Sequence, residues 1–116
     1  MRTGRVFLFY AEEYGIVLAE SIPVAGQPIR TIMNPVNFTM DEISTGSFGR
    51  SVLDSLHRSA NISPMEKDKS ENYWHITGIK DYKRFSKVFG NIKVSLDDSG
   101  IRIEQMKTAR VGGYAL

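Results

Sequence analysis

The chain has 116 residues, of which 41% are hydrophobic and 24% charged, with a net charge of +2 and no cysteine. This length predicts one domain over residues 1–116, and the composition argues against a disordered tail. Without cysteine, disulfides and thiolate metal sites are excluded. Because acidic and basic residues are interspersed, the small positive charge is weak evidence for a nucleic-acid partner.

The chain shows no signal for a membrane. No apolar run approaches the roughly 18–20 residues of a membrane-spanning helix. The short apolar stretch near the start meets Glu12 and Glu13 without a small-residue cleavage pattern, so we expect no signal peptide. We therefore expect a cytoplasmic protein without a membrane partner.

The first third of the chain predicts strands. Residues 6–12 (VFLFYAE) and 16–20 (IVLAE) are rich in aromatic and branched side chains and flank a Tyr-Gly turn signal, which indicates a hairpin. Residues 29–33 predict a short strand that stops before Pro35, because the residue before a proline is restricted.

The strongest helix signal is residues 45–60, TGSFGRSVLDSLHRSA. Apolar side chains recur there at helical spacing, at Phe48, Val52, Leu53 and Leu56. We expect a long helix over about 47–60, capped by Ser47 and lying on a sheet. Just before it, residues 39–42 (TMDE) fit a capping box that opens a single helical turn.

The second half predicts a mixture of elements. Residues 61–72 are polar and predict an exposed loop, and residues 73–79 (YWHITGI) have strand composition. Asp81 is expected to cap a short helix over about 81–89, which Gly90 ends.

The clearest strand signal comes next. Residues 92–96 and 101–104 alternate apolar and polar side chains around an Asp-Asp-Ser-Gly turn, which predicts a hairpin. The whole pattern predicts an α+β fold, with a mainly antiparallel sheet, one long helix and one short helix.

Groups suited to catalysis are scarce. Neither His57 nor His75 has a second ligand at a metal-binding spacing, and GxSxG, GxxxxGK[ST] and GxGxxG motifs are absent. We therefore expect no catalytic residues, no metal site, no cofactor and no small-molecule substrate.

One region suggests another class of function, a small nucleic-acid-binding module built on residues 73–87. Its basic side chains are Lys80, Lys83, Arg84 and Lys87, and its aromatic ones are Tyr73, Trp74 and Tyr82. Interleaved basic and aromatic residues can hold a single strand.

Two stretches resemble a known family, the contact-dependent growth inhibition immunity proteins. They are residues 43–59 (ISTGSFGRSVLDSLHRS) and 92–114 (IKVSLDDSGIRIEQMKTARVGGY), about a third of the chain, and the resemblance is one of spacing and residue class. The first forty residues carry no matching motif. The resemblance implies a bacterial, cytoplasmic, non-catalytic protein that binds the carboxy-terminal toxin domain of a cognate effector, often a nuclease, and blocks its active site.

Such an inhibitor would present carboxylates to a basic active-site cleft and tyrosines as interface anchors. The candidate toxin-binding residues are Glu12, Glu13, Asp41, Glu42, Asp97, Asp98, Tyr10, Tyr14 and Tyr114.

Overall fold

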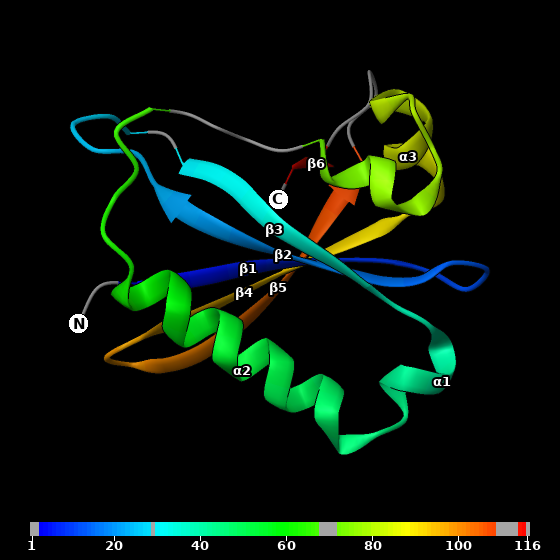
Figure 1. Cartoon of the computed structure of the whole chain (residues 1–116), viewed down its shortest axis with the longest axis horizontal. Helices are drawn as coiled ribbons and strands as arrows, with labels where there is room; N and C mark the ends of the chain where they lie inside the picture. Colours follow the sequence, from blue (N-terminus) through cyan, green and yellow to red (C-terminus); the bar gives the residue numbers. More distant parts are fainter. Residues whose placement is uncertain (1–2, 29, 68–71, 109–113, 116) are drawn as a thin grey trace.

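The computed structural model describes residues 3–28, 30–67, 72–108 and 114–115, and it has an α+β architecture built on one antiparallel sheet (Figure 1). The strands are β1 (Gly4–Ala11), β2 (Gly15–Pro23), β3 (Arg30–Phe38), β4 (Gly90–Asp97), β5 (Gly100–Thr108) and β6 (Tyr114–Ala115). Their order across the sheet is β3-β2-β1-β4-β5-β6. The helices are α1 (Met40–Ile43), α2 (Gly46–Asn61), the 3₁₀ helix η1 (Tyr73–Thr77) and α3 (Tyr82–Val88).

Helix α2 covers one face of the sheet. Alternate residues of the strands point to this face, so Val6, Leu18 and Val94 from three neighbouring strands meet Leu56, which is fully buried. Gly4 permits the close approach, because a Cβ atom there would lie 2.1 Å from the Leu56 carbonyl oxygen. The predicted α+β class and its long helix are therefore confirmed.

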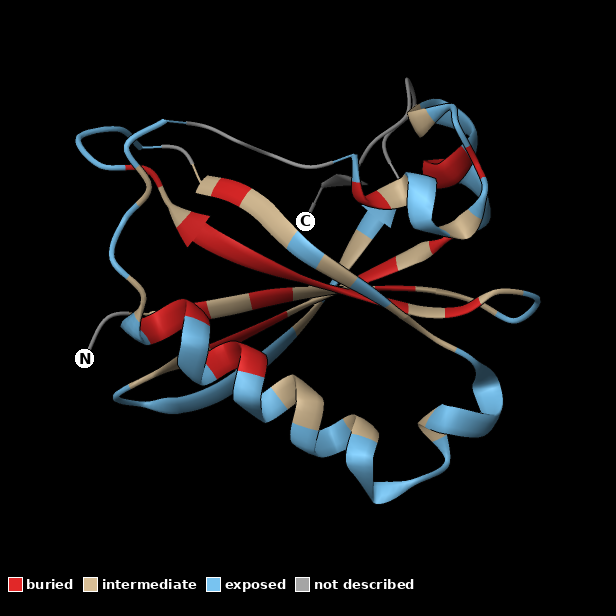
Figure 2. Cartoon of the chain, viewed as in Figure 1, coloured by how far each residue is buried: buried red, intermediate tan, exposed pale blue. Residues whose placement is uncertain are grey.

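Helices η1 and α3 cover part of the opposite face. Phe9 of β1 stacks on Tyr73 with ring centroids 4.6 Å apart, and Phe85 stacks on Phe89 at 4.5 Å. Val17 of β2 is buried in the same cluster. Figure 2 shows buried residues running along β2 between the two helical layers. The sheet therefore carries two separate apolar cores, one on each face.

Polar contacts fasten the end of α2 to the sheet. The Arg58 guanidinium pairs with the buried Glu20 carboxylate, whose other oxygen accepts from Asn34 Nδ2 at 2.8 Å. The Ser59 hydroxyl accepts from the Arg5 backbone N–H at 2.9 Å and donates to the Ser21 carbonyl at 2.5 Å. The helix is thereby fixed in both position and rotation.

The predicted end of the third strand before Pro35 is wrong, because β3 continues to Phe38. The pairing of β2 with β3 shifts register between Leu18 and Glu20, and Asn34 takes a positive φ of 57° there. Proline is tolerated in edge strands and at bulges, and Pro35 has both circumstances.

The predicted strand over residues 73–79 is also wrong, because this segment forms η1. Local hydrogen bonds close it: the His75 N–H donates to Asn72 O at 2.9 Å, and the Gly78 N–H donates to His75 O at 3.0 Å. Gly78 ends the helix with a φ of +89°. The aromatic residues of this segment, whose composition suggests a strand, pack against the face of the sheet that η1 and α3 cover.

Both predicted helices exist, but their ends and faces differ in detail. Thr45, not Ser47, occupies the cap position of α2, and the two hydroxyls are hydrogen-bonded at 2.6 Å. Leu53, expected on the buried stripe, is 45% exposed. Gly90 begins β4 instead of ending α3, and a Cβ atom there would lie 2.3 Å from the Tyr10 ring.

The remaining predicted elements mostly agree with the structure. Both hairpins are present, and so is the Thr39 capping box that opens α1. The predicted loop over 61–72 is described except for residues 68–71, and its Met65 forms a bridge with Val24 beside β2.

We predict that Leu56→Ala lowers the free energy of unfolding by about 2–5 kcal/mol, because it leaves a cavity between α2 and three strands. The measurement is urea denaturation at equilibrium. Leu53→Ala is the matched control on the same helix, and we expect it to cost less than about 1 kcal/mol because its side chain is half exposed. Equal losses for the two variants would contradict this description of the core.

We further predict that Arg58→Ala destabilises the fold by about 2–3 kcal/mol, because it leaves the Glu20 carboxylate buried without its cation. Half of the Arg58 side chain is exposed, so the loss should fall below that of a fully buried pair. Combining Arg58→Ala with Glu20→Gln should recover part of the loss, since no buried charge then remains. A double variant less stable than Arg58→Ala alone would show that the charge is not the cause.

Candidate functional site

Three pockets of the described surface lie around the tip of the β1–β2 hairpin. The Tyr14 N–H donates to Ala11 O at 2.9 Å and closes the turn, and Gly15 follows with a φ of +92°. A Cβ atom at Gly15 would lie 2.0 Å from the Phe38 carbonyl oxygen, so glycine lets β3 and α1 approach the tip. We call residues 10–16 together with α1 the hairpin end.

An apolar pocket of about 420 Å³ lies on the α1 side of this tip. It is lined by Tyr10, Ala11, Glu12, Gly15, Ile16, Met40 and Ile43. Its volume falls within the usual 300–1,000 Å³ range of ligand sites. Met40 is 54% exposed although it is a large apolar residue, so the pocket offers uncovered apolar surface beside a carboxylate.

The α1 helix supplies one wall of this pocket because its capping box fixes its first turn. Thr39 Oγ1 accepts from the Glu42 N–H at 3.3 Å, and Glu42 Oε1 accepts from the Thr39 N–H at 3.0 Å. Met40 and Ile43 thereby line the pocket, while Asp41 and Glu42 are exposed between them in the chain.

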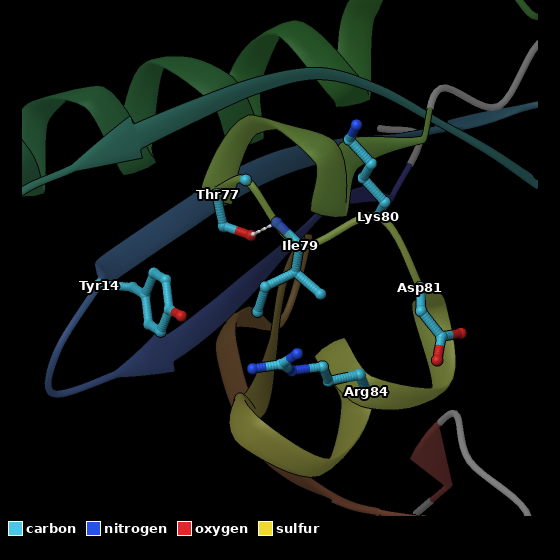
Figure 3. Close-up of a pocket in the computed structure, with 7 residues that line it drawn as sticks. Tyr14, Thr77, Ile79, Lys80, Asp81 and Arg84 are labelled. Carbon is cyan, nitrogen blue, oxygen red and sulfur yellow. Dashed lines mark hydrogen bonds between the residues drawn. The ribbon is translucent and has the colours of Figure 1, made fainter.

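A second, more polar pocket of about 370 Å³ lies on the α3 side of the tip (Figure 3). It is lined by Tyr14, Thr77, Gly78, Ile79, Lys80, Asp81 and Arg84. Figure 3 shows the Tyr14 ring to one side of Ile79 and the Arg84 guanidinium below Ile79. Asp81 caps α3 by accepting from the Lys83 N–H at 3.2 Å, so this carboxylate has a structural role.

A third cavity, of about 410 Å³, shares lining residues with both of these pockets and is lined by Ala11, Glu12, Glu13, Tyr14 and Val88. Glu12 and Glu13 are both exposed at the tip. The hairpin end is therefore acidic toward α1, whereas the opposite pocket is lined by exposed Arg84 of α3 and by exposed Lys80 just before that helix.

The structure brings most of the candidate residues to the hairpin end. These are Tyr10, Glu12, Glu13, Tyr14, Asp41 and Glu42. Asp97 and Asp98 lie at the other end of the sheet, because β4 pairs antiparallel to β1 with Leu96 opposite Gly4. Asp97 Oδ1 accepts from the Ser99 N–H at 2.8 Å within the turn. Tyr114 lies in β6 beside β5, but its side chain falls outside the described part of the structure.

Sequence reasoning missed the apolar members of the site. The sequence presents Ile16 only as a strand residue, Met40 only as part of a capping box, and Ile43 only as the first residue of the stretch that resembles immunity proteins. The missing information is the pairing of β2 with β3, in which Ile16 lies opposite Phe38, two residues before Met40. The capping box was the signal that located α1, but it does not show which strand α1 adjoins.

The alternative site over residues 73–87 divides into two parts. Lys80, Lys83, Arg84 and Lys87 are exposed. Trp74 is only partly exposed, and its indole N–H donates to Lys80 O at 3.3 Å. Its ring lies 5.2 Å from that of Tyr73 and 4.8 Å from that of Tyr82. The tryptophan is therefore engaged in the aromatic cluster, while the basic side chains are open to solvent.

Among the described residues, no group of three or more His, Asp or Glu side chains is placed to hold a metal ion. No helix in this part of the chain is long and apolar enough to cross a membrane. Comparison with protein-family models, curated proteins and solved structures finds no match for the chain. The resemblance to immunity proteins therefore stays a prediction.

Hydrogen bonding within the capping box lowers the pKa of Glu42 below its usual value of 4.5, first through the Thr39 backbone N–H and then through the Thr39 hydroxyl. Because the pKa of Glu42 is lower in the folded chain than in the unfolded chain, the cap contributes its full stabilisation at pH values above the unfolded pKa. This contribution is lost as the pH falls through the folded pKa.

We predict that Thr39→Val raises the Glu42 pKa toward 4.5, as measured by an NMR titration of the Glu42 side chain. Thr77→Val, a hydroxyl deletion outside α1, should leave the Glu42 pKa unchanged. An unaltered Glu42 titration in Thr39→Val would show that the Thr39 hydroxyl does not contribute to the lowered pKa of Glu42.

Proposed function

We propose that this chain is an immunity protein that binds the toxin domain of a contact-dependent inhibition effector and blocks its active site. The observation that carries the proposal is the hairpin end, where an uncovered apolar pocket adjoins exposed carboxylates on two separate elements. The family resemblance over residues 43–59 and 92–114 supplies the class of partner.

The hairpin end has the parts that a protein interface needs. The pocket between Tyr10 and Met40 can receive an apolar or aromatic side chain of the toxin, the kind of central anchor that dominates binding energy. Around it, Glu12, Glu13 and Asp41 can pair with basic groups of a nuclease cleft. A stable complex buries about 1,600 Å² in total, so the interface would extend beyond the pocket over the neighbouring surface.

Charge complementarity should act mainly on the rate of association. Exposed carboxylates steer a basic partner toward the hairpin end and lose this effect as salt rises. The apolar pocket should instead govern the rate of dissociation, because it loses its water only in the docked complex. The inhibitor would then act by occlusion, and no group of its own would take part in chemistry.

The nucleic-acid alternative receives less support. Lys83, Arg84 and Lys87 are exposed as it requires. The ring that would stack a base, Trp74, is engaged with Tyr73 and Tyr82, so only the electrostatic half of that interface is present.

The test uses the carboxy-terminal domain of the protein encoded immediately upstream of this chain, which the proposal requires to be a toxin, purified and co-expressed with it. We predict that Glu12→Lys with Glu13→Lys weakens toxin binding by about 100-fold, mainly through slower association, since like charges then face the basic cleft. Binding kinetics at two salt concentrations would measure this effect.

The matched control reverses two charges at the opposite end of the sheet, Asp97→Lys with Asp98→Lys, and should change affinity by less than about threefold. If the reversal of Asp97 and Asp98 weakens binding and the reversal of Glu12 and Glu13 does not, the interface lies at the β4–β5 turn and not at the hairpin end. If the toxin kills cells that make the native chain, the proposed function fails.

A further inference from the structure

Helices η1 and α3 cover one end of their face of the sheet. Both helices pack over Phe9 and Val17, toward the hairpin tip, on the right in Figure 1. At the other end a polar row crosses the sheet, because Arg5 lies opposite Ser21 on one side and Ser95 on the other. Directly opposite residues in an antiparallel sheet share a face, so this row lies on the same side as Phe7 and Phe9.

Arg5 of this row lies close to Arg30 of β3, which pairs with Pro23, two residues beyond Ser21 on β2. Arg30 Nε donates to Ser21 Oγ, and Arg30 Nη2 donates to Ser21 O, both at 2.8 Å. Arg5 Nε is buried and has no hydrogen-bond partner. Among the described residues, no Asp or Glu forms an ion pair with either guanidinium.

The electrostatics of the pair are unfavourable as they stand. Burial, and then the charge of Arg5, lower the pKa of Arg30 from its ordinary value. A guanidinium nevertheless stays protonated at neutral pH, so two like charges remain side by side on a half-buried surface. An anion placed between them would relieve the repulsion and supply the acceptor that Arg5 Nε lacks.

An aromatic cavity adjoins this pair. It has a volume of about 160 Å³ and is lined by Phe7, Phe9, Ile32, Tyr73, Tyr82, Asn91 and Met106. Phe7 follows Arg5 by two residues on β1, and Ile32 follows Arg30 by two residues on β3. Two residues along a strand span roughly 7 Å, so two lining residues of the cavity lie about that far along the backbone from Arg5 and Arg30.

The wall of the cavity also includes a residue with an unused acceptor. Asn91 is only 3% exposed, lies opposite Phe9 on the neighbouring strand, and its Oδ1 has no hydrogen-bond partner. Leaving a buried acceptor unpaired costs about 1–3 kcal/mol, so a bound group that donates an N–H to Oδ1 would recover part of this cost.

We propose that this face binds a nucleotide, with its base in the aromatic cavity, a base N–H donated to Asn91 Oδ1, and its phosphate held by Arg5 and Arg30. The cavity is smaller than the roughly 300–1,000 Å³ of drug-sized ligand sites, which fits one planar base and excludes a larger ring system. Stacking on Phe7 and Tyr82 follows the usual way in which proteins hold single bases.

Other ligand classes fit less well. A cation would be repelled by Arg5 and Arg30, although the aromatic rings alone would suit it. A purely apolar molecule would leave both Asn91 Oδ1 and Arg5 Nε unpaired. A free anion would use the arginines but not the cavity. Only a ligand with a planar donor group and an attached anion satisfies all of these groups together.

The test is calorimetric titration of the native chain with the four nucleoside 5′-monophosphates, the matching nucleosides, and inorganic phosphate. We expect at least one monophosphate to bind with one-to-one stoichiometry. Its affinity should exceed that of the matching nucleoside, and that of inorganic phosphate, by about tenfold or more. No saturable binding by any monophosphate would overturn the proposal. Phosphate that binds as tightly as every nucleotide would also overturn it, because the site would then be for simple anions.

Variants locate the site. Arg5→Gln and Arg30→Gln should each weaken nucleotide binding by about tenfold, and Asn91→Leu should do the same while leaving phosphate binding unchanged. Arg50→Gln, on the exposed side of α2 across the sheet, is the matched control and should have no effect. A loss in Arg50→Gln as large as that in Arg5→Gln would contradict the assignment.

A measurement on the native chain guards against variants that fail to fold. Backbone amide NMR signals of β1, β3 and β4 around Arg5, Ile32 and Asn91 should shift on addition of nucleotide. Shifts confined to α3 would overturn the proposal and favour the basic surface of that helix instead. This inference is independent of the toxin, since no step of the test includes it.

Discussion

The buried Glu20 carboxylate imposes the constraint on which the arrangement of α2 depends. A carboxylate that is 1% exposed must be paired, and its partners come from two elements, Arg58 of α2 and Asn34 of β3. Because the guanidinium must reach it, this pair limits the rotation of α2 about its axis. Ser59 then lies over the β1–β2 pair, and Leu56 enters the core between β1 and β4.

This fastening acts on one half of α2 and leaves the other half looser. The contacts of Arg58 and Ser59 belong to its last turns, whereas near its start Phe48 meets Phe38 edge-on at 5.1 Å and Leu53 is half exposed. The α1 turn, which precedes α2, lies beyond the sheet edge and forms a wall of the apolar pocket. The pocket at the hairpin end therefore lies near the start of α2, the part of the helix that the polar contacts of Arg58 and Ser59 do not hold.

Local signals in the sequence predict elements well and tertiary placement poorly. The period of the apolar residues around Leu56 locates α2, and the Thr39 capping box locates α1, because both are short-range physical effects. The strand predicted over residues 73–79 is wrong because aromatic side chains favour any half-buried packed surface, and η1 provides such a surface as a strand would. The predicted strand end before Pro35 is wrong because the bulge that tolerates this proline depends on the partner strand.

The candidate sites show the same limit. Pairs of carboxylates are visible in the sequence, but only the strand order places Glu12 and Asp97 at opposite ends of the sheet. Arg5 and Arg30 are separated by 25 positions, and they meet because Ser21, on the strand between them, pairs with one and accepts from the other. No pattern within a single segment carries that information.

The two proposed sites share no residue, yet one short contact links them. Tyr10 lines the apolar pocket at the hairpin end, and its ring packs against Gly90, directly before Asn91 in β4. A toxin side chain that displaces the Tyr10 ring would therefore press on the strand that carries the acceptor of the aromatic cavity. Any coupling through this contact must be reciprocal, so a nucleotide that alters toxin affinity would have its own affinity altered by the toxin by the same factor. Where the Tyr10 ring stays in place on binding, the two sites should behave as independent, because the sheet between them is rigidly paired.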